Sequence, residues 1–453
     1  MPELSVRSRK MALGVQFHPT GHHVAAWHHP RSQIDMGSNP AAYVDLARTA
    51  ERGGFDLIFL ADSLALRDGD IKANGRWPQY MAYLEPLTLL SALSMMTERI
   101  GLVATASTSY SEPFNLARSF ASLDHLSAGR AGWNVVTTGN TASSRNFGRD
   151  VHFEHDARYR RAVEFVEVVK GLWDSWDDDA FVMDRDSGVY VDLSRMHPLN
   201  HRGDHYRVAG PLHMRRPPQG QPVLFQAGTS DAGREVAAEI AEVVFMQNKS
   251  PDFCRQMGED IRARMAKYGR DPADLRIMAG MAVLVAETEE SARAEQDFLQ
   301  SRIHPDVGRA ILSAELAGAD VSDVDVDKPL PLDRIPHGAE RQRSGVQGIL
   351  RIAEEGRMTV REIYEMFSSA RGAPQLIGTP AMIADELERW FTSGAADGFI
   401  IEPSVLPGGL EDFVDLVIPE LRARGLVRDG YEGTTLREHL GLARPADPGT
   451  GAR

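Results

Sequence analysis

The stretch GHHVAAWHHP (residues 21–30) holds four histidines, namely His22, His23, His28 and His29. An imidazole can bind a metal ion, move a proton near neutral pH, or serve as an ordinary loop side chain. Adjacent histidines in an extended loop point in opposite directions, so His22 and His23 do not readily bind one ion. We expect one functional histidine at the edge of a site and no metal, with His28 and His29 structural or facing solvent.

A second stretch, GTSDAGRE (residues 228–235), has the features of an anion-binding helix start. Gly228 lets a ligand approach the backbone closely, and Ser230 can cap the following helix. The N–H groups at the start of a helix bind phosphate well. An ordinary capped helix is the alternative, and the motif alone does not separate the two.

Further polar residues come directly after apolar runs of the chain. These are His18, Asp62, Ser63, Thr105, Ser107, Asn134, Thr137, Thr138, His152, His155 and Tyr159. The set is rich in neutral hydrogen-bonding groups and holds no facing pair of acids, which disfavours a glycosidase. A metal-dependent hydrolase that uses His22, His23 and Asp62 is an alternative.

Eight short apolar runs must position these residues. We expect them as buried strands at residues 11–17, 56–62, 99–107, 131–137, 221–228, 241–248, 276–286 and 397–403. Between them, stretches such as residues 158–176 repeat apolar side chains every three or four residues, as on one helix face. This alternation predicts an α/β fold, a (β/α)8 TIM barrel whose working face lies at the carboxyl ends of the strands. No GxGxxG motif follows the first strand, which disfavours an open dinucleotide-binding sheet.

The whole chain, residues 1–453, is expected to form one barrel domain with two insertions. Residues 177–220 are rich in turn residues and are expected to hold a small hairpin before the fifth strand. Residues 298–378 follow the seventh strand and are longer than a loop needs, so we expect a lid there. Residues 440–453 are expected to form a C-terminal tail.

Composition excludes several classes of function. The 453 residues are 42% hydrophobic and 25% charged, as in ordinary globular proteins. The formal net charge of −14 disfavours nucleic-acid binding, which needs clustered positive charge. Cys254 is the only cysteine, which excludes an intrachain disulfide and a cysteine-based zinc site. Because no apolar run approaches the ~20 residues that span a bilayer and no signal-peptide pattern is present, we expect a cytoplasmic protein.

Longer motifs carry a resemblance to a known family. They are LDHLSAGRAGWNVVTTGNTASSRNFG (residues 123–148) and HDARYRRAVEFVEVVKGLWDSW (residues 155–176), together with GHHVAAW, QAGTSDAGREVAA and YEGTTLREHLGL. On these motifs the chain resembles the bacterial-luciferase-like flavin monooxygenases. Within them it is similar to the nitrilotriacetate, EDTA, dibenzothiophene-sulfone and pristinamycin-synthase monooxygenase branch. The resemblance covers nearly the whole chain.

The resemblance implies a two-component monooxygenase. Such an enzyme takes reduced FMN (FMNH2) from a separate NAD(P)H:flavin reductase, uses O2 as co-substrate, and oxygenates a small organic compound through a flavin peroxide or hydroperoxide. The flavin carries the chemistry, while the protein orients it and excludes water. The residues that match flavin-contacting positions of the family are Asp62, Thr105, Ser107, Asn134, His155, Tyr159, Gly228, Thr229 and Ser230. The last three place the flavin phosphate at the helix after the fifth strand.

The catalytic candidates are His22, Thr138 and Glu315. His22 matches a histidine implicated in catalysis in the sulfone-oxidising members and is expected beside the flavin, with His23 facing away. A loop histidine without a chemical role is the alternative. Sulfone-oxidising members carry a histidine near the position of Glu315, which argues against the same sulfone as substrate here. Glu315 either meets a cationic or amine substrate or caps a turn.

The resemblance also sets expectations for the substrate and partners. The expected substrate is an aminopolycarboxylate, an organosulfur compound or sulfone, or a similar xenobiotic. The expected partners are this substrate and a flavin reductase, possibly met only through diffusible FMNH2, in a homodimer or homotetramer without nucleic acid or membrane. An F420-dependent oxidoreductase on the same barrel and a non-catalytic flavin-binding protein are the open alternatives.

Overall fold

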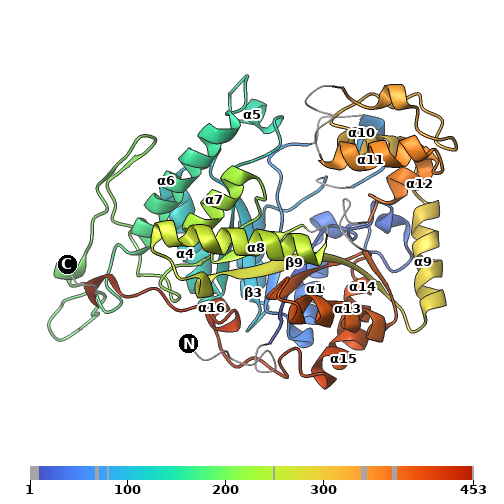
Figure 1. The fold of residues 1–453 in the computed structure, drawn as a ribbon. Helices are drawn as coiled ribbons and strands as arrows, with labels where there is room; N and C mark the ends of the chain where they lie inside the picture. The colour runs from blue at the N-terminus through green and yellow to red at the C-terminus, as the bar shows by residue number, and fades with distance from the viewer. Residues whose placement is uncertain are drawn as a thin grey trace.

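The fold comes from a computed structural model that describes residues 10–66, 71–78, 81–247, 250–337, 344–369 and 375–450. Eight parallel strands form a closed barrel in chain order (Figure 1). They are β1 (Ala12–Gln16), β2 (Leu57–Leu60), β3 (Gly101–Ser107), β4 (Ala131–Val136), β7 (Val223–Gln226), β8 (Val243–Met246), β9 (Arg276–Val285) and β11 (Gly398–Pro403). The ring closes where β11 pairs with β1. The predicted (β/α)8 barrel and its strands are confirmed, with ends that differ by at most two residues.

Both faces of the barrel sheet are buried, because successive side chains of a strand point to opposite faces. Phe59 of β2, Phe225 of β7 and Phe245 of β8 fill the interior, where the Phe59 and Phe245 ring centroids lie 5.3 Å apart. The outward side chains pack against the helices in the largest hydrophobic core. This double burial explains why the strands are near-continuous apolar runs in the sequence.

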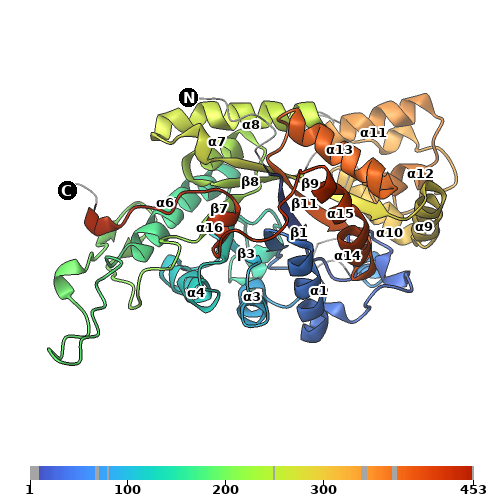
Figure 2. The ribbon, with the colours of Figure 1, turned by 90° about the horizontal axis from the view of Figure 1, so that it is seen from below.

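Helices cover the outside of the barrel (Figure 2). They are α1 (Pro40–Gly53), α3 (Pro86–Ser94), α4 (Pro113–Leu126), α6 (His155–Trp173), α7 (Asp231–Ile240), α8 (Pro251–Met265), α13 (Pro380–Thr392), α14 (Gly408–Asp412), α15 (Ile418–Ala423) and α16 (Leu436–His439). Short helices α2 (Ile71–Asn74) and α5 (Ser143–Asn146) lie in the loops after β2 and β4. Five of the longer helices, α1, α3, α4, α8 and α13, begin at a proline, which suits the first helical position because that position needs no N–H donor.

The amino ends of the strands are closed by the C-terminal part of the chain. Leu436 of α16, with Leu440 and Leu442 directly after the helix, belongs to the same hydrophobic cluster as the interior phenylalanines. Figure 2 looks at this end of the barrel, where α16 lies across the opening. Arg437 donates hydrogen bonds to both carboxylate oxygens of Glu242, at 2.6 and 3.1 Å. The base of the barrel is thus plugged by leucines and sealed by a buried ion pair.

The long segment after β9 forms a helical subdomain with its own hydrophobic core. It holds α9 (Glu289–Ser301), α10 (Pro305–Glu315), α11 (Ser344–Glu355), α12 (Val360–Glu365) and β10 (Gln375–Gly378). Its hydrophobic cluster also contains Val24 and Ala25, which come from the loop after β1. Figure 1 shows the helices on the same side of the barrel as α5. β10 pairs with the carboxyl-terminal part of β9. It is a ninth parallel strand, which the sequence analysis did not predict.

The segment before β7 holds a small antiparallel hairpin of β5 (His201–Arg202) and β6 (Arg207–Val208). Figure 1 shows that residues before this hairpin extend away from the barrel. Among the described residues, every helix is too short or too polar to cross a membrane.

Candidate active site

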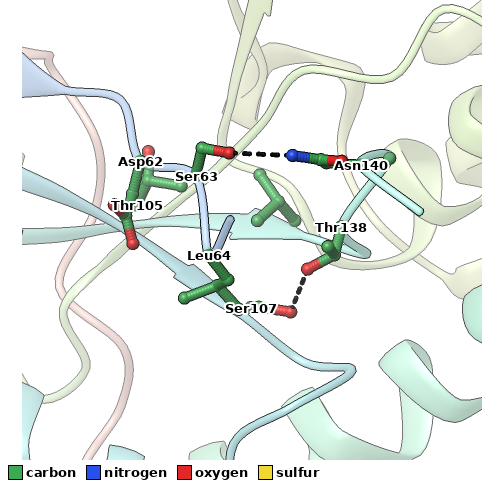
Figure 3. Close-up of a pocket in the computed structure, with 9 residues that line it drawn as sticks. Asp62, Ser63, Leu64, Thr105, Ser107, Thr138 and Asn140 are labelled. Carbon is green, nitrogen blue, oxygen red and sulfur yellow. Dashed lines mark hydrogen bonds between the residues drawn. The ribbon is translucent and has the colours of Figure 1, made fainter. Parts of the chain in front are cut away.

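A cavity of about 160 Å³ lies at the carboxyl ends of β2, β3 and β4. Figure 3 shows its lining, which consists of Asp62, Ser63, Leu64, Thr105, Ser107, Val136, Thr138, Gly139 and Asn140. Three strands therefore bring five of the predicted polar residues to one place, namely Asp62, Ser63, Thr105, Ser107 and Thr138. This is the end of the barrel at which parallel strands present their loop residues.

Thr138 combines a strained backbone with a firmly held side chain. Its φ of 53° lies in the left-handed region, which threonine rarely adopts. Its Oγ1 lies 2.5 Å from the Oγ of Ser107. Its carbonyl oxygen accepts hydrogen bonds from Nε2 of His152, at 2.9 Å, and from the guanidinium of Arg158. These contacts offset the strain and hold a pair of hydroxyl groups at the cavity wall.

Asn134 presents a buried acceptor behind the cavity. It pairs in register with Thr105, and its Nδ2 donates to the Thr105 Oγ1 at 2.8 Å. The residue is 4% exposed, and its Oδ1 has no hydrogen-bond partner among the described residues. Gln16, at the end of β1, has a buried Oε1 that also lacks a hydrogen-bond partner among the described residues. Since a buried acceptor without a partner costs free energy, this end of the barrel fits a ligand that supplies N–H donors.

The loops after β2 and β4 are joined across the cavity mouth. The Nδ2 of Asn140 donates to the Ser63 Oγ at 3.4 Å and to the carbonyl of Ala65 at 3.0 Å. Among the described residues Asp62 is the single carboxylate in the lining, and burial, helped by the charge of Glu85, raises its pKa. The cavity therefore offers mainly neutral hydrogen-bonding groups and lacks an acid pair for hydrolysis.

The predicted phosphate site lies at the start of α7, directly after β7. The Oγ of Ser230 accepts a hydrogen bond from the N–H of Gly233 at 3.1 Å, so Ser230 is the N-cap. A Cβ on Gly228 would lie 3.1 Å from the Cα of Gly233, closer than ordinary packing allows. Thr229 and Ser230 are exposed. The Asp231 carboxylate in the first turn is paired with Arg264 at 2.7 Å, which reduces its repulsion of an anion.

His155 and Tyr159 lie one turn apart at the start of α6, with ring centroids 4.9 Å apart. The His155 side chain is 52% exposed, and its Nδ1 lies 2.9 Å from the Asp156 carboxylate. Among the described residues that line the cavity, neither His155 nor Tyr159 is present. The helix that carries them, α6, packs beside α7. The predicted flavin-binding residues thus fall into two groups, one at the cavity and one at the starts of α6 and α7.

The four clustered histidines go to different surroundings. The N–H of His22 donates to the carbonyl of Pro403 at 2.9 Å, and its ring lies 5.3 Å from that of His18. His23 turns toward the inserted helices, and burial lowers its pKa to about 3. Its Nδ1 accepts a hydrogen bond from the N–H of Ala25 at 3.1 Å.

Of the other two histidines, His28 lies at the surface of the loop and His29 is half-buried. The ring of His28 is exposed and lies 3.8 Å from that of Trp27. The Nε2 of His29 lies 3.4 Å from the carboxylate of Glu295. Across the described part of the chain, no three His, Cys, Asp or Glu side chains gather in a way that holds a metal ion.

Glu315 is the last residue of α10, in the inserted helices, and is not part of the cavity lining. Sequence reasoning missed another acid, Glu402, which is 2% exposed at the end of β11. The Nε2 of Gln247 donates to its Oε2 at 3.2 Å. The signal for this residue was a charged side chain inside the apolar run DGFIIEP.

Two residues that support the site, Arg158 and Asn140, were missed, whereas His152 was among the polar residues that the sequence analysis singled out. His152 and Arg158 hold the carbonyl of Thr138, and Asn140 ties two loops together. Arg158 lies within the motif HDARYRR, between His155 and Tyr159. Its role depends on the angle at which α6 meets β4, which no local pattern reveals.

Comparison with known proteins places this site in a family. The family model described as "Luciferase-like monooxygenase" matches residues 20–397. The chain belongs to this family. It is a flavin-dependent monooxygenase, and the cavity at the ends of β2, β3 and β4 lies on the side of the barrel where such enzymes place their sites.

Two relatives match over almost their full length. N-acetyl-S-(2-succino)cysteine monooxygenase of Bacillus subtilis (strain 168) is 46% identical, over 98% of this chain and 99% of the relative. Nitrilotriacetate monooxygenase component A of Aminobacter aminovorans is 45% identical, over 97% and 98%. The chain therefore shares the whole architecture of these monooxygenases.

Solved structures agree. The crystal structure of DmoA from Hyphomicrobium sulfonivorans has a TM-score of 0.85 at 33% identity and covers 95% of this chain and 92% of its own. Riboflavin lyase, solved with modified FMN and riboflavin, has a TM-score of 0.83 at 30% identity and covers 96% of each chain.

Proposed function

We propose that this protein is the oxygenase of a two-component system that uses FMNH2 from a separate NAD(P)H:flavin reductase. The observation that carries the proposal is the neutral, hydrogen-bonding cavity with the buried Oδ1 of Asn134 behind it. Such a lining orients a redox cofactor and supplies no acid pair or metal cluster of its own within the described residues.

The residues fit reduced FMN. Reduction adds an N–H donor to the flavin ring, and the Oδ1 of Asn134 and the hydroxyl groups of Thr105 and Ser107 are matching partners. Gly228 and Ser230, with Thr229, would hold the phosphate at the open start of α7. When bound, reduced FMN supplies the electrons that activate O2.

The chain's own residues orient the cofactor and handle protons. We assign His22, beside His18, as the group that accepts or donates a proton at the site, because imidazole titrates near neutral pH. Thr138 and Ser107 hold a hydroxyl pair at the cavity wall. Glu315, at the end of α10, is assigned to the substrate side.

The proposed substrate is a small organic compound with an oxidisable sulfur or nitrogen. Two relatives are named for a succinylated cysteine and for nitrilotriacetate, which carry such a heteroatom beside carboxylates. A relative's description as component A fits an oxygenase that receives its flavin from another protein. We further propose a cytoplasmic homodimer or homotetramer.

The test is an oxygen-labelling assay. Purified protein is supplied with FMN, NADH, an unrelated flavin reductase and catalase under ¹⁸O2, with N-acetyl-S-(2-succino)cysteine or nitrilotriacetate as substrate. Mass spectrometry is expected to find one labelled oxygen atom in the product or in the fragment that it releases. Product formation without flavin, or with oxygen from water alone, would contradict the proposal.

A further inference from the structure

Three arginines, one of which contacts the cavity residue Thr138, have no acidic partner among the described residues. Arg149 lies in the loop after β4, and Arg158 and Arg161 lie on α6. Among the described residues none of them forms an ion pair, whereas arginines elsewhere, such as Arg264 and Arg424, each pair with several carboxylates. The Nε atoms of Arg158 and Arg161 are buried and have no hydrogen-bond partner in the described chain.

Aromatic rings hold these cations without neutralising them. The Cζ of Arg149 lies 3.9 Å from the ring centroid of Phe153. The Cζ of Arg161 lies 4.6 Å from the ring centroid of Tyr206. A cation over a ring is stabilised by the electron density of the ring and keeps its full charge for a ligand.

One nearby carboxylate, that of Glu164, is already occupied by other hydrogen-bond donors. Glu164, three residues after Arg161, accepts hydrogen bonds from the ring of His201 and from the N–H groups of His205 and Tyr206. Arg158 and Arg161 are themselves three residues apart on α6, so two like charges face each other near the positive end of the helix dipole. This arrangement costs stability, and such costs are typical of functional sites.

One of the three arginines, Arg158, is linked to the cavity through Thr138. The Nε2 of His152 and the guanidinium of Arg158 both donate to the carbonyl of Thr138, whose side chain lines the cavity. The hydroxyl of Tyr110, in the loop after β3, lies 2.6 Å from the Nδ1 of His152. Ser230 lies after β7, on the opposite side of β4 from β3. Because α6, which carries Arg158 and Arg161, packs beside α7, only titration with phosphorylated and unphosphorylated flavin separates the arginines from the predicted phosphate site.

We propose that Arg149, Arg158 and Arg161 form an anion-recognition site that binds a carboxylate of the substrate, while the reacting part of the substrate lies in the cavity beside Thr138. This inference rests on the proposed oxygenase function, which supplies the reaction. If the inference is correct, the substrate is an anion. Arg158 then has a second role, which is to position Thr138.

The test uses succinate as the probe and its neutral diamide as the matched control, in isothermal titration of the full chain. Arg149→Gln and Arg161→Gln are compared with Arg160→Gln, because Arg160 is an exposed arginine of the same helix without an ion pair among the described residues. Succinate is expected to bind and the diamide not to bind. Each of the first two variants is expected to weaken succinate binding by about 10- to 100-fold, and Arg160→Gln by less than about twofold.

Reduced FMN and reduced riboflavin, titrated into the same variants, separate a substrate carboxylate from the flavin phosphate. The proposal expects unchanged affinity for both flavins. If Arg149→Gln lowers the affinity for FMN but not for riboflavin, and leaves the affinity for succinate unchanged, the arginines bind the flavin phosphate. This result would overturn the proposal. Equal loss in Arg160→Gln, or no succinate binding by the wild type, would also overturn it. If succinate behaves as expected and reduced flavin does not bind, the oxygenase function fails and the anion site stands.

Discussion

At the base of the barrel Arg437 is 3% exposed and donates to Glu242, whereas at the carboxyl end Asn134 is 4% exposed and keeps its Oδ1 without a partner in the described chain. Arg130, also at the base, donates five hydrogen bonds to Ser127, Thr97, Ile100 and Ser94. Arg437, Arg130 and Asn134 are similarly buried, and they differ in whether their side-chain polar atoms have hydrogen-bond partners.

This difference separates stability from binding. Buried polar groups in native proteins are normally hydrogen-bonded, so an unpartnered one calls for a ligand or a structural reason. Arg437 and Arg130 at the base follow the rule, and the carboxyl end departs from it at Asn134 and Gln16. In this barrel, burial alone therefore does not identify the site, but unpartnered acceptors at the ends of the strands do.

The largest effect is expected at the base. Arg437→Ala leaves the Glu242 carboxylate and the carbonyl of Gln221 without their donor, and we expect the free energy of unfolding to fall by about 3–5 kcal/mol. Urea unfolding followed by circular dichroism measures it. Arg444→Ala is the matched control, because its pair with Asp178 is partly exposed and contributes at most about 1 kcal/mol. An equal loss of unfolding free energy in the two variants would contradict the view that the buried pair at the base contributes more stability than an exposed pair.

We expect the free energy of unfolding to fall at acid pH because of buried histidines at both ends of the barrel. Burial lowers the pKa of His23 to about 3, so folding disfavours its charged form. The penalty is near zero above pH 6.5 and grows as the pH falls toward the folded pKa. Between pH 7 and pH 5 this group should cost about 2 kcal/mol of unfolding free energy.

His23→Asn tests this assignment. The variant should lose about 2 kcal/mol less than the wild type between pH 7 and pH 5 in urea unfolding. His439, whose pKa burial lowers to about 4 at the base, should respond in the same way. Parallel pH dependence of wild type and His23→Asn would show that the ring is solvated or charged in the folded protein.

Asn134→Ala should separate binding from stability. We expect reduced FMN to bind about 10-fold more weakly, as for one lost hydrogen bond, while the unfolding free energy changes by less than about 1 kcal/mol. The stability change is small because the substitution also removes a buried acceptor without a partner. A large loss of stability with unchanged flavin affinity would move Asn134 from the binding group to the structural group.

At the start of α7 we expect an effect similar in size to that of Asn134→Ala. Ser230→Ala removes the hydrogen bond to the N–H of Gly233 and should destabilise the helix by about 1 kcal/mol. It should also weaken reduced FMN by about 1–2 kcal/mol, while riboflavin, which lacks the phosphate, keeps its affinity. Equal weakening of FMN and riboflavin would remove Ser230 from the phosphate site.

The sequence predicted the barrel because its strands are apolar on both faces and lie between turn residues. It also predicted that Thr105, Ser107 and Thr138 meet, since residues just past parallel strands share one edge of the sheet. The ninth strand, β10, was missed because four residues after a long insertion carry too little pattern.

Tertiary contacts set the rest of the site. Arg158 meets Thr138 only because α6 returns to the end of β4, and Val24 joins the core of the inserted helices from a distant loop. The motif LDHLSAGR shows the converse. Its Asp124 accepts hydrogen bonds from Ala131 and Gln219, and with Arg130 it serves the base of the barrel and not the cavity.

The most direct test of this account is an anaerobic titration of the purified protein with FMN in both redox states. The account predicts that reduced FMN binds at least about 10-fold more tightly than oxidised FMN, because the buried acceptors at the carboxyl end match the donor gained on reduction. Equal affinity for the two states, or no binding of either, would contradict the assignment of this end of the barrel to reduced flavin.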